Sequence, residues 1–144
     1  MSARLPLLPS WIRWGFVLAI GGYIFYVSLV TVPPTTVVDT AKPAILPLDK
    51  WRHFLAYAVF GGTVAYATAD WHTGIQYQIL LIVGITITYG IGIEMGQAFV
   101  PNRYASVADA YANAIGALLI LPWYALRPHA EFVPVYELLS GDSS

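Results

Sequence analysis

The chain has 144 residues, of which 58% are hydrophobic and 10% charged, with a mean hydropathy of +0.63 and a formal net charge of −1. Soluble domains carry about a quarter charged residues, so this apolar excess exceeds what one soluble core can bury and indicates a polytopic membrane protein. The near-neutral charge gives no basic footprint for a nucleic-acid partner. The absence of cysteine excludes disulfides, thiolate metal sites and a cysteine nucleophile.

Four apolar segments follow one another along the chain, each near the ~20 residues that cross the hydrocarbon core of a bilayer. They cover residues 11–32, 51–69, 75–100 and 107–126. The first is longer than the apolar region of a signal peptide, and we expect it to be retained. The predicted fold is an all-α bundle of four transmembrane helices, with one membrane domain over residues 1–126 and a short soluble tail over residues 127–144.

The connection between the first two segments, residues 33–49, holds four prolines and cannot be one regular helix. An even number of spans places both termini on one side of the membrane. The positive-inside rule does not decide which side, because cations occur on both: Arg4, Arg13 and Arg127 on the terminal side, and Lys42, Lys50, Arg52 and Arg103 on the other. We expect a multi-pass protein of the cell membrane with cytoplasmic termini, and the sequence indicates no oligomeric state.

Polar residues gather where the third segment ends and the fourth begins. Glu94 and Gln97 close the third segment, Arg103 lies in the turn, and Asp109 and Asn113 open the fourth. Because successive spans cross the membrane in opposite directions, the start of the second segment lies at this same end. An ionisable residue inside a membrane segment is expensive, and it marks a functional site by default.

Helical spacing places these residues on shared faces. Asp49, His53 and Tyr57 recur at i, i+4 and i+8, Glu94 and Gln97 at i and i+3, and Asp109, Asn113 and Gly116 at i, i+4 and i+7. Polar faces in a membrane are accommodated most easily when they point at one another. The predicted ligand-binding set is therefore Lys50, His53, Tyr57, Glu94, Gln97, Arg103, Asp109 and Asn113.

The same residues carry a resemblance to a known family. Asp49-Lys50-x-x-His53-Phe54-x-x-Tyr57, followed by Glu94-x-x-Gln97-x-Phe99-x-Pro101-x-Arg103-x-x-Ser106-x-x-Asp109-x-x-x-Asn113-x-x-Gly116, resembles the VanZ-like family of small membrane proteins. The family's usual Pro-Gly-Arg turn reads Pro101-Asn102-Arg103 here, and Asn also tolerates turn conformations. The resemblance implies a multi-helix membrane protein and a link to low-level resistance to the glycopeptide teicoplanin, but it supplies no reaction.

Three classes of function stay open from the residues alone. The leading one is a polar pocket at the outer membrane face that recognises the headgroup of a lipid or of a lipid-linked envelope precursor, with Lys50 and Arg103 as partners for phosphate or carboxylate. The second is an intramembrane hydrolase or transferase, with His53, Glu94 and Asp109 as acid–base candidates. The third is a structural or partner-binding subunit, in which the acids and cations only neutralise one another.

A metal site is a further alternative, because His53 together with Asp49, Glu94 and Asp109 offers ligands for a hard or borderline cation. Lys50 and Arg103 would compete for the same carboxylates. The sequence therefore predicts neither a metal nor a cofactor, and whether the protein is an enzyme stays open.

Overall fold

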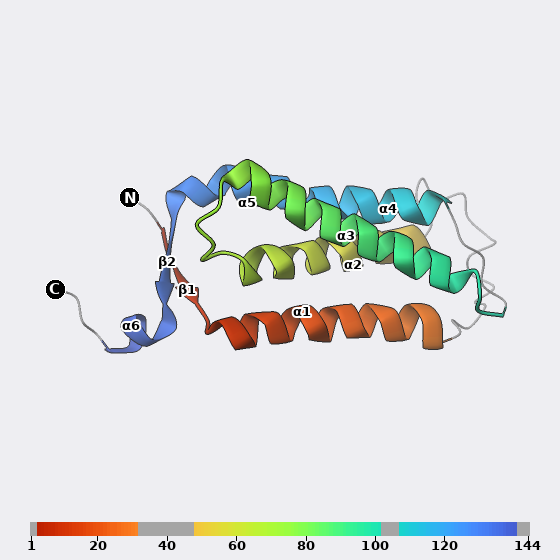
Figure 1. Cartoon of the computed structure of the whole chain (residues 1–144), viewed down its shortest axis with the longest axis horizontal. Coiled ribbons are helices and arrows are strands. Elements are labelled where there is room, and N and C mark those ends of the chain that lie inside the picture. Colours follow the sequence, from red (N-terminus) through yellow and green to blue (C-terminus); the bar gives the residue numbers. More distant parts are fainter. Residues whose placement is uncertain (1–2, 32–47, 102–106, 141–144) are drawn as a thin grey trace.

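The computed structural model describes residues 3–31, 48–101 and 107–140. Its helices lie side by side along one long axis, and both chain ends are at the same end of the bundle (Figure 1). The long helical segments are α1 (Ser10–Phe25) with its π-helical continuation η1 (Tyr26–Val30), α2 (Leu48–Ala67), α3 (Ile75–Gln97), α4 (Val107–Leu118) and α5 (Ile120–Leu126). The predicted helical architecture is therefore confirmed.

Two helical segments in the described part of the chain are long and apolar enough to cross a membrane. They are Ser10–Val30 and Ile75–Gln97. The α2 helix carries Lys50, Arg52 and His53 in its first turns, and α4 is only 12 residues long. The expectation of four transmembrane helices therefore stays a prediction for α2 and for the α4–α5 segment.

The predicted fourth span is divided at Leu119, where α4 ends and α5 begins. Pro122 explains the break. Its ring has no N–H and collides with the carbonyl of the residue four positions earlier, which is Leu118. The chain responds with a tighter turn, in which the Leu119 N–H bonds to the carbonyl oxygen of Gly116 at 3.1 Å.

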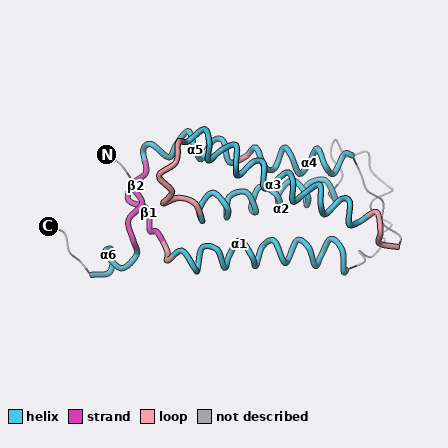
Figure 2. Tube along the Cα trace, in the orientation of Figure 1, coloured by secondary structure: helices cyan, strands magenta, loops and turns pink. Residues whose placement is uncertain are grey.

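A small sheet at the terminal end was not predicted. The strand β1 (Ala3–Leu7) pairs in parallel with β2 (Ala130–Pro134), with Ala3 opposite Ala130 and Leu7 opposite Pro134. The strands lie beyond the helix ends (Figure 2). The short helix η3 (Arg127–His129) leads into β2, and α6 (Val135–Ser140) follows it.

The closest helix packing in the bundle is between α2 and α4. A Cβ added at Gly116 would lie 2.4 Å from the backbone oxygen of Phe54, so only glycine permits the observed approach. Around this crossing the apolar core is built from the buried side chains of Tyr57, Phe60, Val64, Ile82, Ile93, Ile120 and Tyr124. This packing fixes the relative position of the polar side chains on α2 and α4.

Helix α1 joins the bundle through a few specific contacts. The Tyr89 hydroxyl donates to the carbonyl oxygen of Gly21 at 2.6 Å, and the Leu29 side chain fills the space beside Gly96. The Gln97 amide donates to the carbonyl oxygen of Ser28 at 3.3 Å. These contacts tie α1 and η1 to α3 near the end opposite the termini.

Candidate functional site

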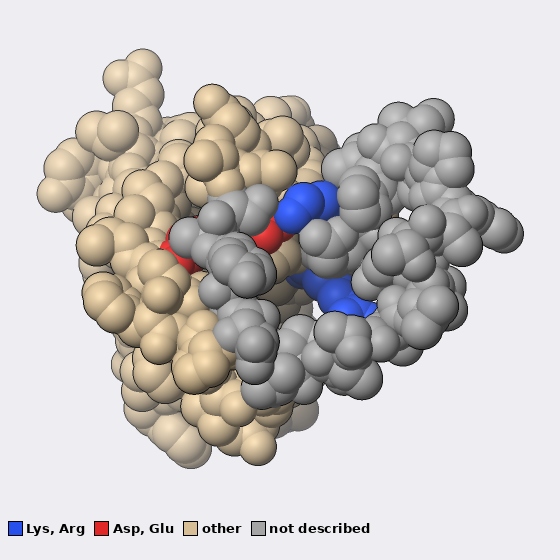
Figure 3. Space-filling model, turned by 90° about the vertical axis from the view of Figure 1, so that its right-hand side faces the viewer, with Lys and Arg blue, Asp and Glu red and all other residues tan. Residues whose placement is uncertain are grey.

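Five polar side chains from three helices meet at the end of the bundle opposite the termini. Lys50 and His53 come from the first turns of α2, Glu94 from the last turn of α3, and Asp109 and Asn113 from the start of α4. We call these five residues the His53 cluster. Viewed from this end, acidic and basic side chains appear close together, with uncharged described residues beside them (Figure 3).

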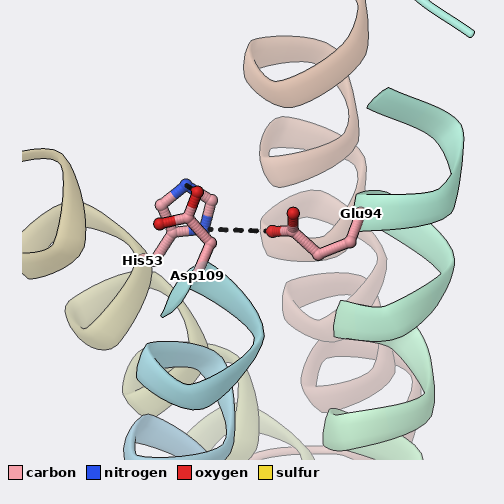
Figure 4. A group of neighbouring side chains, drawn as sticks. All are labelled: His53, Glu94 and Asp109. Atoms are coloured by element: carbon pink, nitrogen blue, oxygen red, sulfur yellow. Dashed lines mark ion pairs between the residues drawn. The ribbon is translucent and has the colours of Figure 1, made fainter. Parts of the chain in front are cut away.

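His53 lies between two carboxylates. Its Nδ1 is 3.8 Å from Oε1 of Glu94, and its Nε2 is 4.0 Å from Oδ2 of Asp109. Figure 4 shows the three side chains converging from their separate helices. Both distances exceed hydrogen-bond range, so each ring nitrogen faces a carboxylate without a direct bond to it.

Asn113 connects His53 to Glu94. Its amide oxygen is 3.1 Å from Nδ1 of His53, and its amide nitrogen donates to Oε1 of Glu94 at 3.5 Å. An amide oxygen only accepts hydrogen bonds, so Nδ1 is the donor in this pair. The helix spacing of Asp109 and Asn113 therefore places one acid and one amide against the same imidazole.

Lys50 lies beside Asp109, and its Nζ donates a hydrogen bond to Oδ1 of that carboxylate. Glu94 and Asp109 are both buried, whereas Lys50 and His53 are partly exposed. The buried layer of the cluster is thus acidic, and a cation lies closer to the surface. Negative charge therefore lies deeper in the bundle and positive charge lies nearer its surface.

Tyr57 lies one helical turn below His53 on α2 and is 1% exposed. Its ring and the Asn113 side chain both approach Gly90, where an added Cβ would lie 3.1 Å from Tyr57 and 3.3 Å from Asn113. Among the described residues, the Tyr57 hydroxyl is buried without a hydrogen-bond partner. The predicted position of Tyr57 on the His53 face agrees with this arrangement.

The other predicted ligand-binding residues are placed differently. Gln97 is buried one turn beyond Glu94, but its amide reaches the Ser28 carbonyl oxygen rather than His53 or Asn113. Arg103, the Asp49 side chain and the connection over residues 33–47 lie outside the described residues. The structure therefore assembles Lys50, His53, Tyr57, Glu94, Asp109 and Asn113, and it directs Gln97 towards η1.

The ligand atoms of His53, Glu94 and Asp109 lie within 4.8 Å of one another, close enough to share a metal ion. The chemistry of the surroundings argues against that use. Lys50 already donates to Asp109, and an ammonium group competes with a metal for the same carboxylate. The observed arrangement is better suited to polar groups that both donate and accept hydrogen bonds.

A second polar group at the terminal end was missed by the sequence reasoning. It consists of Arg13, Asp70, Gln78, Tyr124 and Arg127, and we call it the Asp70 cluster. Arg13, which is 2% exposed, donates to both carboxylate oxygens of Asp70, at 3.0 and 2.6 Å, and to the carbonyl oxygens of Tyr66 and Ala67. The Arg13 hydrogen bonds hold the pKa of Asp70 below its usual value.

Arg127 likewise bonds a backbone carbonyl and a side chain of the same region. It donates to the carbonyl oxygen of Ala69 at 2.6 Å and to the Gln78 side-chain oxygen, which also accepts from Tyr124. Gln78 in turn donates to the carbonyl oxygen of Trp71 at 2.8 Å. The sequence did contain a signal for this cluster. Gln78 is a polar residue inside an apolar segment, as Glu94 is.

A comparison with protein families tests the resemblance noted in the sequence. Residues 11–127 match the VanZ/LLP1 family, which is most of the chain and includes every residue of both clusters. The chain belongs to the VanZ/LLP1 family. The suspected kinship is confirmed, and this VanZ/LLP1 protein is a membrane protein. Neither curated proteins nor solved structures give a match.

Proposed function

We propose that the His53 cluster recognises the headgroup of a membrane lipid or lipid-linked envelope precursor, one that carries a phosphate and hydrogen-bond donors. The observation that carries the proposal is the convergence of Lys50, His53, Glu94, Asp109 and Asn113 from three helices. The buried carboxylates suit the hydroxyl or ammonium donors of a headgroup. Lys50, nearer the surface, suits its phosphate.

The alternative that the cluster only locks helix ends together is less favoured by the geometry. Arg13 locks its helix end through a bidentate pair with Asp70, with hydrogen bonds of 3.0 and 2.6 Å. At His53, by contrast, the carboxylates are 3.8 and 4.0 Å from the ring nitrogens. The Tyr57 hydroxyl is also buried without a hydrogen-bond partner in the described part of the chain.

Native mass spectrometry of the purified protein tests the proposal. Wild type is expected to retain a phosphate-bearing lipid, which extraction identifies. Lys50→Gln and Arg103→Ala are expected to reduce its occupancy at least about tenfold, equivalent to about 1.4 kcal/mol. Arg52→Gln is the matched control, because Arg52 is an exposed cation on the same helix. Equal lipid occupancy in all four proteins contradicts the proposal.

Acid–base catalysis is the second candidate, and the His53–Asn113–Glu94 chain favours it. Asn113 fixes the proton on Nδ1, which leaves Nε2 as the acid–base position when the ring is neutral. Catalysis predicts that His53→Ala and Glu94→Gln abolish turnover of the retained lipid while the variants stay folded. Recognition alone predicts no turnover by wild type, measured by thin-layer chromatography of the lipid.

We propose a multi-pass topology in which the termini and the Asp70 cluster face the cytoplasm and the His53 cluster faces outward. The natural chain has no cysteine, so single cysteines report topology directly. His72→Cys, in the turn after α2, is expected to resist an impermeant maleimide in intact cells, and Pro101→Cys is expected to react. The opposite labelling pattern reverses the orientation. A role in teicoplanin resistance follows only if deleting the protein lowers resistance to that drug.

A further inference from the structure

The Tyr57 hydroxyl is not explained by the packing of the helices. Tyr57 is 1% exposed, and its hydroxyl is buried without a hydrogen-bond partner among the described residues. Tyr89, whose ring centroid is 6.3 Å away, donates instead to the carbonyl oxygen of Gly21 at 2.6 Å. A buried hydroxyl without a partner loses the hydrogen bonds that it made to water, so it disfavours folding where a phenylalanine would not. The Tyr57 hydroxyl therefore contributes nothing to the helix packing that a phenylalanine could not supply.

Contacts at α3 join Tyr57 to the His53 cluster. A Cβ added at Gly90 would lie 3.1 Å from Cε1 of Tyr57 and 3.3 Å from Nδ2 of Asn113, so the ring and the amide pack against the same point on α3. Nδ2 of Asn113 donates to Glu94, which is buried one turn further along the same face of α3 as Gly90. The amide oxygen of Asn113 meets Nδ1 of His53. Tyr57 therefore lies beside the buried side of the cluster.

Polar side chains continue from the surface of the bundle down to Tyr57. The side chains of Lys50 and His53 are 18% and 19% exposed, those of Asp109 and Glu94 are 12% and 8% exposed, and Tyr57 is 1% exposed. Tyr57 follows His53 by four residues on α2, a rise of about 6 Å. A glycerol or sugar unit attached to a phosphate spans a comparable depth. A headgroup whose phosphate lies at Lys50 can therefore extend its polar end towards Tyr57.

The hydrogen-bonding chemistry at this depth favours one kind of group. The Tyr57 hydroxyl needs an acceptor for its hydrogen, whereas the carboxylates of Glu94 and Asp109 only accept hydrogen bonds. An alcohol hydroxyl both accepts and donates, so it satisfies both requirements. An ammonium group only donates, and it would leave the Tyr57 hydrogen without an acceptor. A site built to bond a hydroxyl rejects analogues that lack one, because its buried polar groups are then left unpaired.

We propose that Tyr57 sets the headgroup specificity of the His53 cluster by donating a hydrogen bond to an alcohol hydroxyl of the headgroup, an inference that rests on the proposed function. The ligand is then a lipid with a polyol phosphate headgroup, such as a glycerol phosphate or a sugar phosphate, rather than a lipid with an amine. Its hydroxyl accepts from Tyr57 and donates to a buried carboxylate of the cluster, and its phosphate lies at Lys50.

Three dioleoyl lipids separate this inference from recognition of the phosphate alone. Phosphatidylglycerol carries hydroxyls, phosphatidylpropanol has the same charge and the same three headgroup carbons without a hydroxyl, and phosphatidylethanolamine carries an ammonium group. In native mass spectrometry, wild type is expected to bind phosphatidylglycerol at least about tenfold better than either of the others. Tyr57→Phe is expected to lose that preference, with phosphatidylpropanol occupancy unchanged and a lipid-free melting temperature no lower than that of wild type. The matched control is Tyr89→Phe, which removes a bonded hydroxyl and should melt lower but keep the preference.

The inference is overturned if Tyr57→Phe keeps the wild-type preference, or if wild type binds either of the other two lipids as well as phosphatidylglycerol. It is also overturned if lipid-free Tyr57→Phe melts well below wild type, because the hydroxyl then serves the fold rather than a ligand. Lys50→Gln tests the proposed function separately. It should lower the occupancy of phosphatidylglycerol and of phosphatidylpropanol by the same factor, since both carry the phosphate. If Lys50→Gln lowers neither, recognition of the phosphate itself fails; if it lowers both while Tyr57→Phe keeps the preference, only the role of Tyr57 fails.

Discussion

Each end of the bundle holds a cluster of polar and charged side chains, but the hydrogen bonding of the two clusters differs. At the terminal end, Arg13 donates to the carbonyl of Ala67 at the end of α2 and Arg127 to that of Ala69 in the following turn, and both also bond side chains. At the other end, His53 faces two carboxylates at 3.8 and 4.0 Å without a hydrogen bond to either. The first arrangement fulfils a structural need of the helix terminus. In the second, the imidazole is hydrogen-bonded to Asn113 and lies between the two carboxylates without bonding either.

The two ends differ in which hydrogen-bond acceptors the cations serve. The last carbonyls of a helix have no partner within the helix, and a buried terminus needs external donors. Arg13 supplies them to Tyr66 and Ala67, while Arg127 bonds the Ala69 carbonyl in the turn that follows. Cations at a helix C-terminus are also favoured by its dipole. The His53 cluster lies at the other end of α2, where the first N–H groups of that helix, rather than carbonyls, need partners from outside it.

The largest expected effect comes from disturbing the contact that assembles the His53 cluster. Gly116→Ala would place a Cβ 2.4 Å from the Phe54 carbonyl oxygen, which forces α2 and α4 apart. We expect a loss of about 3 kcal/mol of stability and a lower melting temperature in detergent. Gly62→Ala, with nothing within 4 Å of the new Cβ, is the control and should melt like wild type.

Removing Arg13 tests the structural role of the Asp70 cluster. Arg13→Met keeps the apolar stem but leaves the carbonyls of Tyr66 and Ala67 without these donors and Asp70 without its cation. We expect a loss of about 2 kcal/mol, measured by thermal or denaturant unfolding, with lipid occupancy preserved. Arg4→Met serves for comparison, because the Arg4–Glu131 pair is exposed and 3.9 Å apart, and it should change stability by less than about 0.5 kcal/mol.

Replacing His53 should lower lipid occupancy and leave stability nearly unchanged, the reverse of the effect expected for Arg13→Met. His53→Gln retains a side chain that donates to Asn113, so we expect a stability change of about 1 kcal/mol or less. Lipid occupancy should fall strongly, because a Gln side chain does not place a second polar nitrogen beside Asp109 as the His53 ring does with Nε2. A variant that melts far below wild type would instead place His53 among the structural residues.

The smallest expected effect is a pH dependence at the terminal end. Since Arg13 lowers the pKa of Asp70 in the folded protein, the Asp70 contribution to stability is present above the unfolded pKa. It is lost as the pH falls through the lower, folded pKa, in the region below about pH 4. Wild type should therefore lose more melting temperature on acidification than Asp70→Asn does. Parallel curves for the two proteins would show that the pair contributes nothing.

The helical architecture and the convergence of polar residues at one end could be predicted from the sequence. The details of individual contacts could not. Hydropathy and parity predicted that Lys50, His53, Glu94 and Asp109 meet, because antiparallel helices bring alternate ends together. The direction of the Gln97 side chain was not predictable, because it depends on where η1 approaches α3. Glu94 was marked by its position in an apolar segment, its spacing to Gln97 and the family motif, whereas Gln78, a polar residue in the same segment, was not considered.

Two other features of the fold were not predicted, one with a local cause and one with a long-range cause. The break at Leu119 follows from Pro122 and was accessible from the steric rule for proline, but the predicted span extended through it. The pairing of β1 with β2 joins segments more than a hundred residues apart, and neither strand has a periodicity that marks it. Tertiary context, rather than local propensity, decides such short strands.

The most direct test of the contrast between the two ends is the rise in melting temperature produced by dioleoyl phosphatidylglycerol in wild type, Arg13→Met and His53→Gln. A ligand stabilises only the state that binds it, so the rise reports binding independently of the starting stability. The account predicts that Arg13→Met melts lower than wild type but shows the same rise, and that His53→Gln melts near wild type without the rise. A rise that persists in His53→Gln and disappears in Arg13→Met would contradict the assignment of recognition to the His53 cluster.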